Sequence, residues 1–182
     1  NSNGIYDIFK YMEIERLEKE KILGLNIDFD RVNLYAMYSL SILVPLVIGK
    51  PQILVGSFVN FLIVYSTLKY GLKKTIPILL LPSITATSKG ILFGGATYFL
   101  LYLMPFIILA NYTLSYFVSR DKYFLKPLGI IFKVFFLYIS YLTMNRVLGL
   151  PDVLLSSIPT QFLTASIGFS LAFALYNFCN KE

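Results

Sequence analysis

"PQILVGSFVNFLIVYSTL", residues Pro51–Leu68, is an apolar stretch close in length to the ~20 residues with which a helix crosses a membrane. It nevertheless carries Gln52 at its start, Gly56 and Ser57 in its wall and Asn60 near its middle. A span that only anchors a protein has no use for a buried carboxamide, because lipid cannot satisfy its hydrogen-bonding groups. The stretch therefore predicts a helix that crosses a membrane within a bundle and turns its polar side chains toward other helices.

The composition of the whole chain agrees with a membrane location. The chain has 182 residues, of which 57% are hydrophobic and 14% charged, and its mean hydropathy is +0.69. Soluble domains are roughly 25% charged, so the excess apolar surface of this chain has to face lipid. The sequence contains no His and one Cys, Cys179. It therefore excludes zinc or haem sites built on His, Ser-His-Asp catalysis and an internal disulfide.

Six apolar segments follow one another closely, and each approaches the length of a membrane span. They are Val32–Gly49, Pro51–Leu68, Leu72–Ser88, Ala96–Val118, Leu128–Val147 and Pro159–Phe178. The third contains Pro77 and Pro82, so we expect that helix to be broken or tilted. The sequence predicts an all-α integral membrane protein, with a transmembrane domain of about six helices over residues 32–182.

The first part of the chain, residues 1–31, has a different character. Between Gly4 and Lys21, apolar residues recur every three or four positions, while seven acids and bases occupy the stretch from Glu13 to Lys21. This pattern predicts a charged, amphipathic helix on the cytoplasmic side. It would lie at the membrane surface or against a partner protein, or else be solvated over most of its surface.

The distribution of Lys and Arg predicts the orientation. With a cytoplasmic N-terminus, twelve of the sixteen Lys and Arg residues lie on the inner side, and Lys133 lies within a span. Only Lys50, Lys89 and Arg146 then lie outside. By the positive-inside rule, both termini are expected in the cytoplasm of a cell whose membrane this chain crosses several times. The net charge of +6 then reflects topology, and we expect no binding to nucleic acid.

Polar residues gather in the outer half of the predicted bundle. The carboxamides of Gln52, Asn60, Asn111 and Gln161 are expected to line one cavity open to the outside, with Thr164 as a further ligand-binding residue. The third span brings Ser83, Thr85, Thr87 and Ser88 to the same side, and the last outer loop adds Asn145, Arg146 and Asp152. The alternative is that Asn60 and Asn111 merely hydrogen-bond across packed helices.

Lys133 is the single cation well inside a predicted span, about five residues from its inner end. It could snorkel to the interface, pair with a carbonyl oxygen or serve a function. No Asp or Glu lies inside any of the six segments, which argues against a carboxylate proton relay and against an intramembrane aspartyl protease. We expect neither an enzyme nor a bound cofactor or metal, because no nucleophile with a base and no set of metal ligands is visible.

Several motifs together resemble the substrate-binding S components of energy-coupling factor (ECF) transporters. They are "PQILVGSFVN", "LLPSITATSKG" leading to "MPFIILAN", "GIIFKVFFLYIS" and "QFLTASIG", in this order from about Val32 to the end of the chain. The resemblance implies a six-helix protein that captures a vitamin or related micronutrient from outside. In that family a transmembrane coupling subunit and two ATPases supply the energy. The first predicted span has Ala36, Ser39 and Ser41 in place of the closely spaced alanines with which S components contact the coupling subunit.

A second hypothesis is an accessory subunit of a larger membrane complex, for example a redox or hydrogenase-associated one. The polar positions would then only hold helices together, and the partners would be other subunits and lipids in place of a small solute.

Overall fold

The computed structural model describes residues 28–48, 50–89 and 99–179, and this part of the chain is helical throughout, with no strands. The amphipathic helix predicted between Gly4 and Lys21 lies outside the described residues. The chain divides into two compact units, Asn1–Tyr35 and Ala36–Glu182. In the first unit, α2 (Phe29–Val47) begins after Asp28, whose carboxylate accepts the backbone N–H of Arg31 at 3.2 Å and caps the helix.

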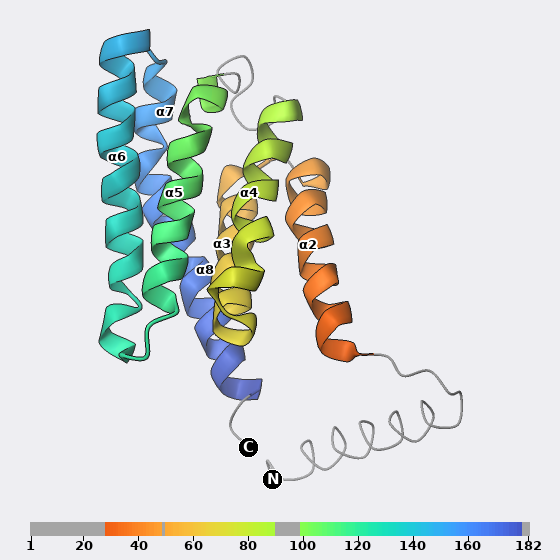
Figure 1. Cartoon of the computed structure of the whole chain (residues 1–182). Helices are drawn as coiled ribbons and strands as arrows, with labels where there is room; N and C mark the ends of the chain where they lie inside the picture. Colours follow the sequence, from red (N-terminus) through yellow and green to blue (C-terminus); the bar gives the residue numbers. More distant parts are fainter. Residues whose placement is uncertain (1–27, 49, 90–98, 180–182) are drawn as a thin grey trace, which may run out of the picture. The chain divides into compact units, whose positions relative to one another are not determined.

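The second unit contains the rest of α2 and the remaining helices (Figure 1). They are α3 (Gln52–Tyr70), α4 (Leu72–Lys89), α5 (Leu100–Val118), the 3-10 turn η2 (Tyr123–Leu125), α6 (Leu128–Leu148), the short α7 (Asp152–Ser156) and α8 (Ile158–Cys179). A helix therefore occurs at each of the six apolar segments, with ends a few residues from those predicted.

Four helical segments of the described chain are long and apolar enough to cross a membrane: Gln52–Tyr70, Leu100–Val118, Tyr123–Leu148 and Asp152–Cys179. They are compatible with a membrane protein. The helices α2 and α4 do not reach the same hydropathy, because Asp30 and Arg31 lie in α2 and Lys73 and Lys74 in α4. The expected count of six membrane spans thus stays a prediction.

The third segment was expected to be broken or tilted, and it is not broken, since α4 runs without interruption through Pro77 and Pro82. The tilt stays a prediction. Proline removes a backbone N–H, so carbonyl oxygens in the preceding turn of the helix need other partners. The hydroxyl of Tyr38 on α2 donates to the carbonyl oxygen of Lys74, in the turn before Pro77, at 2.7 Å. This contact ties α4 to α2 close to Pro77, although the carbonyl oxygen that Pro77 itself leaves without a helical donor is that of Lys73, four residues before it.

The most extensive helix contact is between α3 and α8. It rests on small residues: Thr164, Gly168 and Ala172 recur every four positions along α8 and are buried. A Cβ atom added at Gly168 would lie 2.6 Å from the backbone oxygen of Ser57, closer than any packing allows. A Cβ at Gly56 would lie 3.0 Å from the side chain of Thr164. Gly56 therefore permits a neighbouring helix to approach closely, and that helix is α8.

Buried hydroxyl groups add polar contacts among the central helices. Thr67 on α3 hydrogen-bonds to Ser115 on α5, and its hydroxyl also donates to Thr75 on α4 at 3.5 Å. All three residues are buried, next to a core that includes Leu62, Ile63 and Leu114. Hydroxyls of this kind can bond their own helix and a neighbour at once, so they link helices without leaving a donor unpaired.

Candidate functional site

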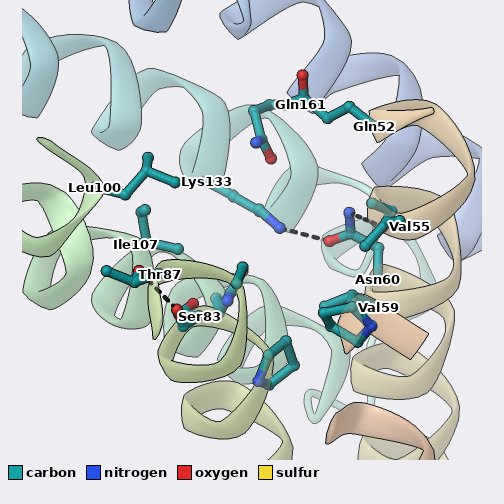
Figure 2. A pocket seen from close by; sticks show the side chains of 15 residues that line it. Gln52, Val55, Val59, Asn60, Ser83, Thr87, Leu100, Ile107, Lys133 and Gln161 are labelled. Carbon is teal, nitrogen blue, oxygen red and sulfur yellow. Dashed lines mark hydrogen bonds between the residues drawn. The ribbon is translucent and has the colours of Figure 1, made fainter. Parts of the chain in front are cut away.

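A cavity of about 110 Å³ lies within the second unit (Figure 2). Its walls come from α2, α3, α4, α5, α6 and α8, so every long helix of this unit contributes at least one side chain. A water molecule needs only ~10–15 Å³ by the same kind of measure, so the cavity has room for several waters or a small solute.

The four carboxamides predicted to share a cavity do line this one: Gln52, Asn60, Asn111 and Gln161. They come from α3, α5 and α8, three helices that are far apart in the sequence. Whether the cavity opens to the outside of a cell depends on the orientation, which stays a prediction.

Asn60 is the most firmly held of the four. It is 2% exposed, and its side-chain N–H group donates to the Gly56 carbonyl oxygen at 2.8 Å and to the Thr164 hydroxyl at 3.5 Å. Its side-chain oxygen accepts a hydrogen bond from the ammonium group of Lys133, which Figure 2 shows as a dashed line. The Gly56 oxygen can only accept and the ammonium can only donate, so both neighbours fix the same orientation of the amide.

Lys133 does not snorkel to an interface, so the structure rules out one of the alternatives drawn from the sequence. Its side chain is 3% exposed and extends from α6 across the cavity toward Asn60 (Figure 2). The reason is its position around the helix: Gly129, Lys133, Leu137 and Ser140 recur every three or four residues on the buried side of α6. Of the alternatives drawn from the sequence, pairing with a carbonyl oxygen is the one observed, and the oxygen belongs to a side chain.

Gln52 is the first residue of α3, directly after Pro51. Its side-chain nitrogen Nε2 is buried and has no hydrogen-bond partner among the described residues, although the side chain lines the cavity. An unpaired buried donor costs about 1–3 kcal/mol. Gln52 therefore keeps an unpaired donor beside the cavity.

Asn111 and Gln161 complete the polar wall. Asn111 lies on α5 and is 4% exposed. Gln161 lies on α8 and also borders a second, smaller cavity of about 40 Å³, which Leu103, Leu137 and Leu154 line with apolar side chains. The two cavities share Leu100, Ile107 and Gln161, so an apolar recess adjoins the polar one.

Thr164 occupies a different place from the one expected of a ligand-binding residue. It is 1% exposed, packs against Gly56 and is not among the residues that line the cavity. Its hydroxyl donates to the carbonyl oxygen of Gln161 at 3.2 Å and accepts from Asn60. Thr164 thus supports Asn60 from α8.

Of the other polar residues predicted in the outer half of the bundle, some line the cavity and others do not. Ser83 and Thr87 on α4 line the cavity, and the Thr87 hydroxyl donates to the Ser83 carbonyl oxygen at 2.8 Å. Asn145 instead fixes the connection after α6, since it donates to the Tyr141 hydroxyl at 2.8 Å and to the Leu150 carbonyl oxygen at 3.0 Å. Asp152 is exposed at the start of α7.

The cavity therefore combines one ammonium group, four carboxamides and apolar walls, and no acidic side chain of the described residues lines it. Such a set can bind and orient a polar molecule through hydrogen bonds and charge. Comparison of the chain with protein-family models, with curated proteins and with solved structures finds no match.

Proposed function

We propose that this chain is a solute-capture subunit of a cell membrane, similar in role to the S components of ECF transporters. It takes a small, vitamin-like or micronutrient solute from the outer side and hands it to partner subunits that use ATP. The observation that carries the proposal is the convergence of Gln52, Asn60, Asn111 and Gln161 on one cavity.

The cavity wall contains a polar group that lacks a hydrogen-bond partner within the described chain. The buried nitrogen of Gln52 has no partner in the described chain, and Asn111 faces the same space. Polar groups used only to join helices end in mutual hydrogen bonds, because each group left unpaired costs stability. A carboxamide kept at a cavity wall without such a bond, as in Gln52, favours a binding role.

The proposal assigns solute binding to this chain and energy supply to its partners, because of what the sequence contains. No Gly-rich phosphate-binding loop with its Lys occurs in the sequence, so the chain has no nucleotide site of that type with which to drive transport. Binding would then belong to this chain, and energy coupling to a membrane-embedded partner and its ATPases. In this proposal the protein crosses the membrane several times, with both termini in the cytoplasm and no catalytic step of its own.

The second hypothesis, an accessory subunit of a larger membrane complex, is favoured by one observation. Asn60 is fully engaged in contacts between helices, bonding its own turn, α8 and α6 at once. This is what a residue that only joins helices would do, and it separates Asn60 from Gln52 and Asn111.

The test is to purify the full-length chain from its own cells in lipid nanodiscs and to identify both the retained small molecules and the partner proteins. The proposal expects a retained solute in the wild type, and ATPases with a membrane coupling protein among the partners. Asn111→Leu should lose the solute while its thermal midpoint stays close to that of the wild type. Thr113→Val is the matched control on the same helix, since among the described residues the Thr113 hydroxyl bonds only the Leu109 carbonyl oxygen, at 2.9 Å. Redox subunits as partners, with no retained solute, would favour the accessory role instead.

A further inference from the structure

The buried ammonium group of Lys133 has no acidic partner in the described part of the chain. Its hydrogen-bond acceptor is the neutral amide of Asn60. The described acids of the second unit are Asp121 and Asp152, which are both exposed and do not line the cavity. A charge buried in this way is costly unless an opposite charge or several hydrogen bonds compensate it. The site as it stands supplies one acceptor and no negative charge.

The other free groups at the cavity are of a matching kind. Gln52 presents a buried N–H donor without a partner, and the carboxamide of Asn111 faces the same space. Asn60 offers no further donor, because its N–H group is already bonded to Gly56 and Thr164. Asn60 therefore holds the Lys133 ammonium in place, while Lys133, Gln52 and Asn111 contribute further donor groups to the cavity wall.

We propose that the solute of this cavity is a monoanion, best matched by a carboxylate, whose charge pairs with Lys133 and whose oxygens accept hydrogen bonds from Gln52 and Asn111. This inference rests on the proposed function and names the chemical class of its solute. One ammonium group balances one negative charge. A doubly charged phosphate ester would leave a buried charge without a partner, which makes it a poor fit.

The other residues that line the cavity indicate the polarity of the rest of the solute. Val55, Val59, Leu100 and Ile107 line the same cavity, and the adjoining recess is walled largely by leucine and isoleucine side chains. The carboxylate is accordingly attached to a small body that is apolar for much of its surface. Gln161 lies where the two cavities meet and is placed to bond a polar group on that body.

The test compares the wild type with Lys133→Met, both purified as full-length chains from the same cells into nanodiscs of uncharged phosphatidylcholine. Removing a buried charge in favour of an apolar side chain of similar length is compatible with folding, so the thermal midpoint of Lys133→Met should not fall far. Lys133→Gln, which keeps a donor without the charge, serves as a second variant. Lys122→Met removes the same charge at an exposed position and is the matched control.

The molecules released on denaturation are identified by mass spectrometry, and the retained species is then titrated back alongside its uncharged amide. We expect a monocarboxylate in the wild type and in Lys122→Met, and binding about 30-fold weaker or worse in Lys133→Met and Lys133→Gln. The amide should bind the wild type and Lys133→Met to a similar extent.

The outcomes of this experiment distinguish the proposed monoanion from the proposed function, solute capture. A retained solute that is neutral or cationic would overturn the monoanion and leave solute capture intact. A retained anionic phospholipid alone would also overturn it, since the anion would then be a lipid headgroup. No retained solute in any of the proteins would contradict the proposed function itself.

Discussion

The ammonium group of Lys133 on α6 donates a hydrogen bond to the side-chain oxygen of Asn60 on α3, although 73 positions separate the two residues in the sequence. The same amide donates to the Thr164 hydroxyl on α8. Asn60 therefore joins three helices through one side chain and fixes the position of the only cation that lines the cavity among the described residues.

We expect Asn60→Leu to destabilise the protein, because it leaves the buried ammonium without its acceptor. Hydrogen bonds to charged groups contribute about 1.5–3 kcal/mol, and a loss of this size should appear in thermal unfolding in detergent. Adding Lys133→Met to Asn60→Leu should recover much of the loss, since the double variant has no orphaned charge. Losses that simply add in the double variant would show that the two side chains are not coupled.

The positions of the helices could be predicted from the sequence because apolar length is a simple signal. The segments Pro51–Leu68 and Leu128–Val147 match α3 and α6 to within two residues at each end. The continuity of α4 could not be predicted in the same way. Pro77 and Pro82 indicate a break locally, whereas contacts that hold α4, such as the hydrogen bond from Tyr38 to the Lys74 carbonyl oxygen, come from another helix.

The carboxamides of the candidate site could be predicted from the sequence, whereas the buried charge of Lys133 at the cavity could not. Lipid cannot satisfy a carboxamide, so Asn60 and Asn111 had to turn inward wherever their helices lay. Lys133 was judged by its distance from the end of the span, whereas its register with Gly129 and Ser140 on α6 decides that it is buried. The sequence places Thr164 in the outer half of its span, but which side of α8 faces the cavity and which faces α3 is a tertiary property.

Both termini are predicted to lie in the cytoplasm, because three cations fall outside in that orientation and twelve inside. A reporter fused to the C-terminus that is active only in the cytoplasm should be active, and one that is active only outside should be silent. The opposite pattern would place the cavity toward the cytoplasm and contradict capture from the outer side. Fusions after Arg120, in the connection between α5 and α6, should behave as the C-terminal fusions do.

Gly168→Ala should destabilise the protein even though alanine is the better helix former. Replacing glycine inside a helix normally adds roughly 0.5–1 kcal/mol of stability. Here the new Cβ would lie 2.6 Å from the backbone nitrogen of Phe61 and from the backbone oxygen of Ser57, so α3 and α8 must separate. We expect a net loss of about 1–3 kcal/mol in thermal unfolding, typical of an overfilled core.

Gly56→Ala is the matched comparison for Gly168→Ala and should cost less. Its Cβ would meet the side chain of Thr164 at 3.0 Å, and a side chain can move where backbone cannot. Equal losses in the two variants would mean that the contact between α3 and α8 is looser than the structure describes. Ala174→Val, at an exposed position of α8, should change the midpoint little.

Gln52→Met should raise stability and reduce solute retention, and these opposite changes distinguish a binding residue from a structural one. The buried nitrogen Nε2 of Gln52 has no partner in the described chain, so an apolar side chain of similar length removes a cost of about 1–3 kcal/mol. The thermal midpoint of the empty protein should rise by a few degrees, since each kcal/mol shifts it by roughly 2–4 °C for a chain of this size. Retention of the solute should fall, because the variant no longer donates to it.

Gln161→Met is the control for stability, since no buried unpaired atom of Gln161 is found in the described chain and its removal brings no such gain. A lower midpoint in Gln52→Met would show that Nε2 is bonded in the empty protein, through water or a neighbour, and that its role is to support the fold.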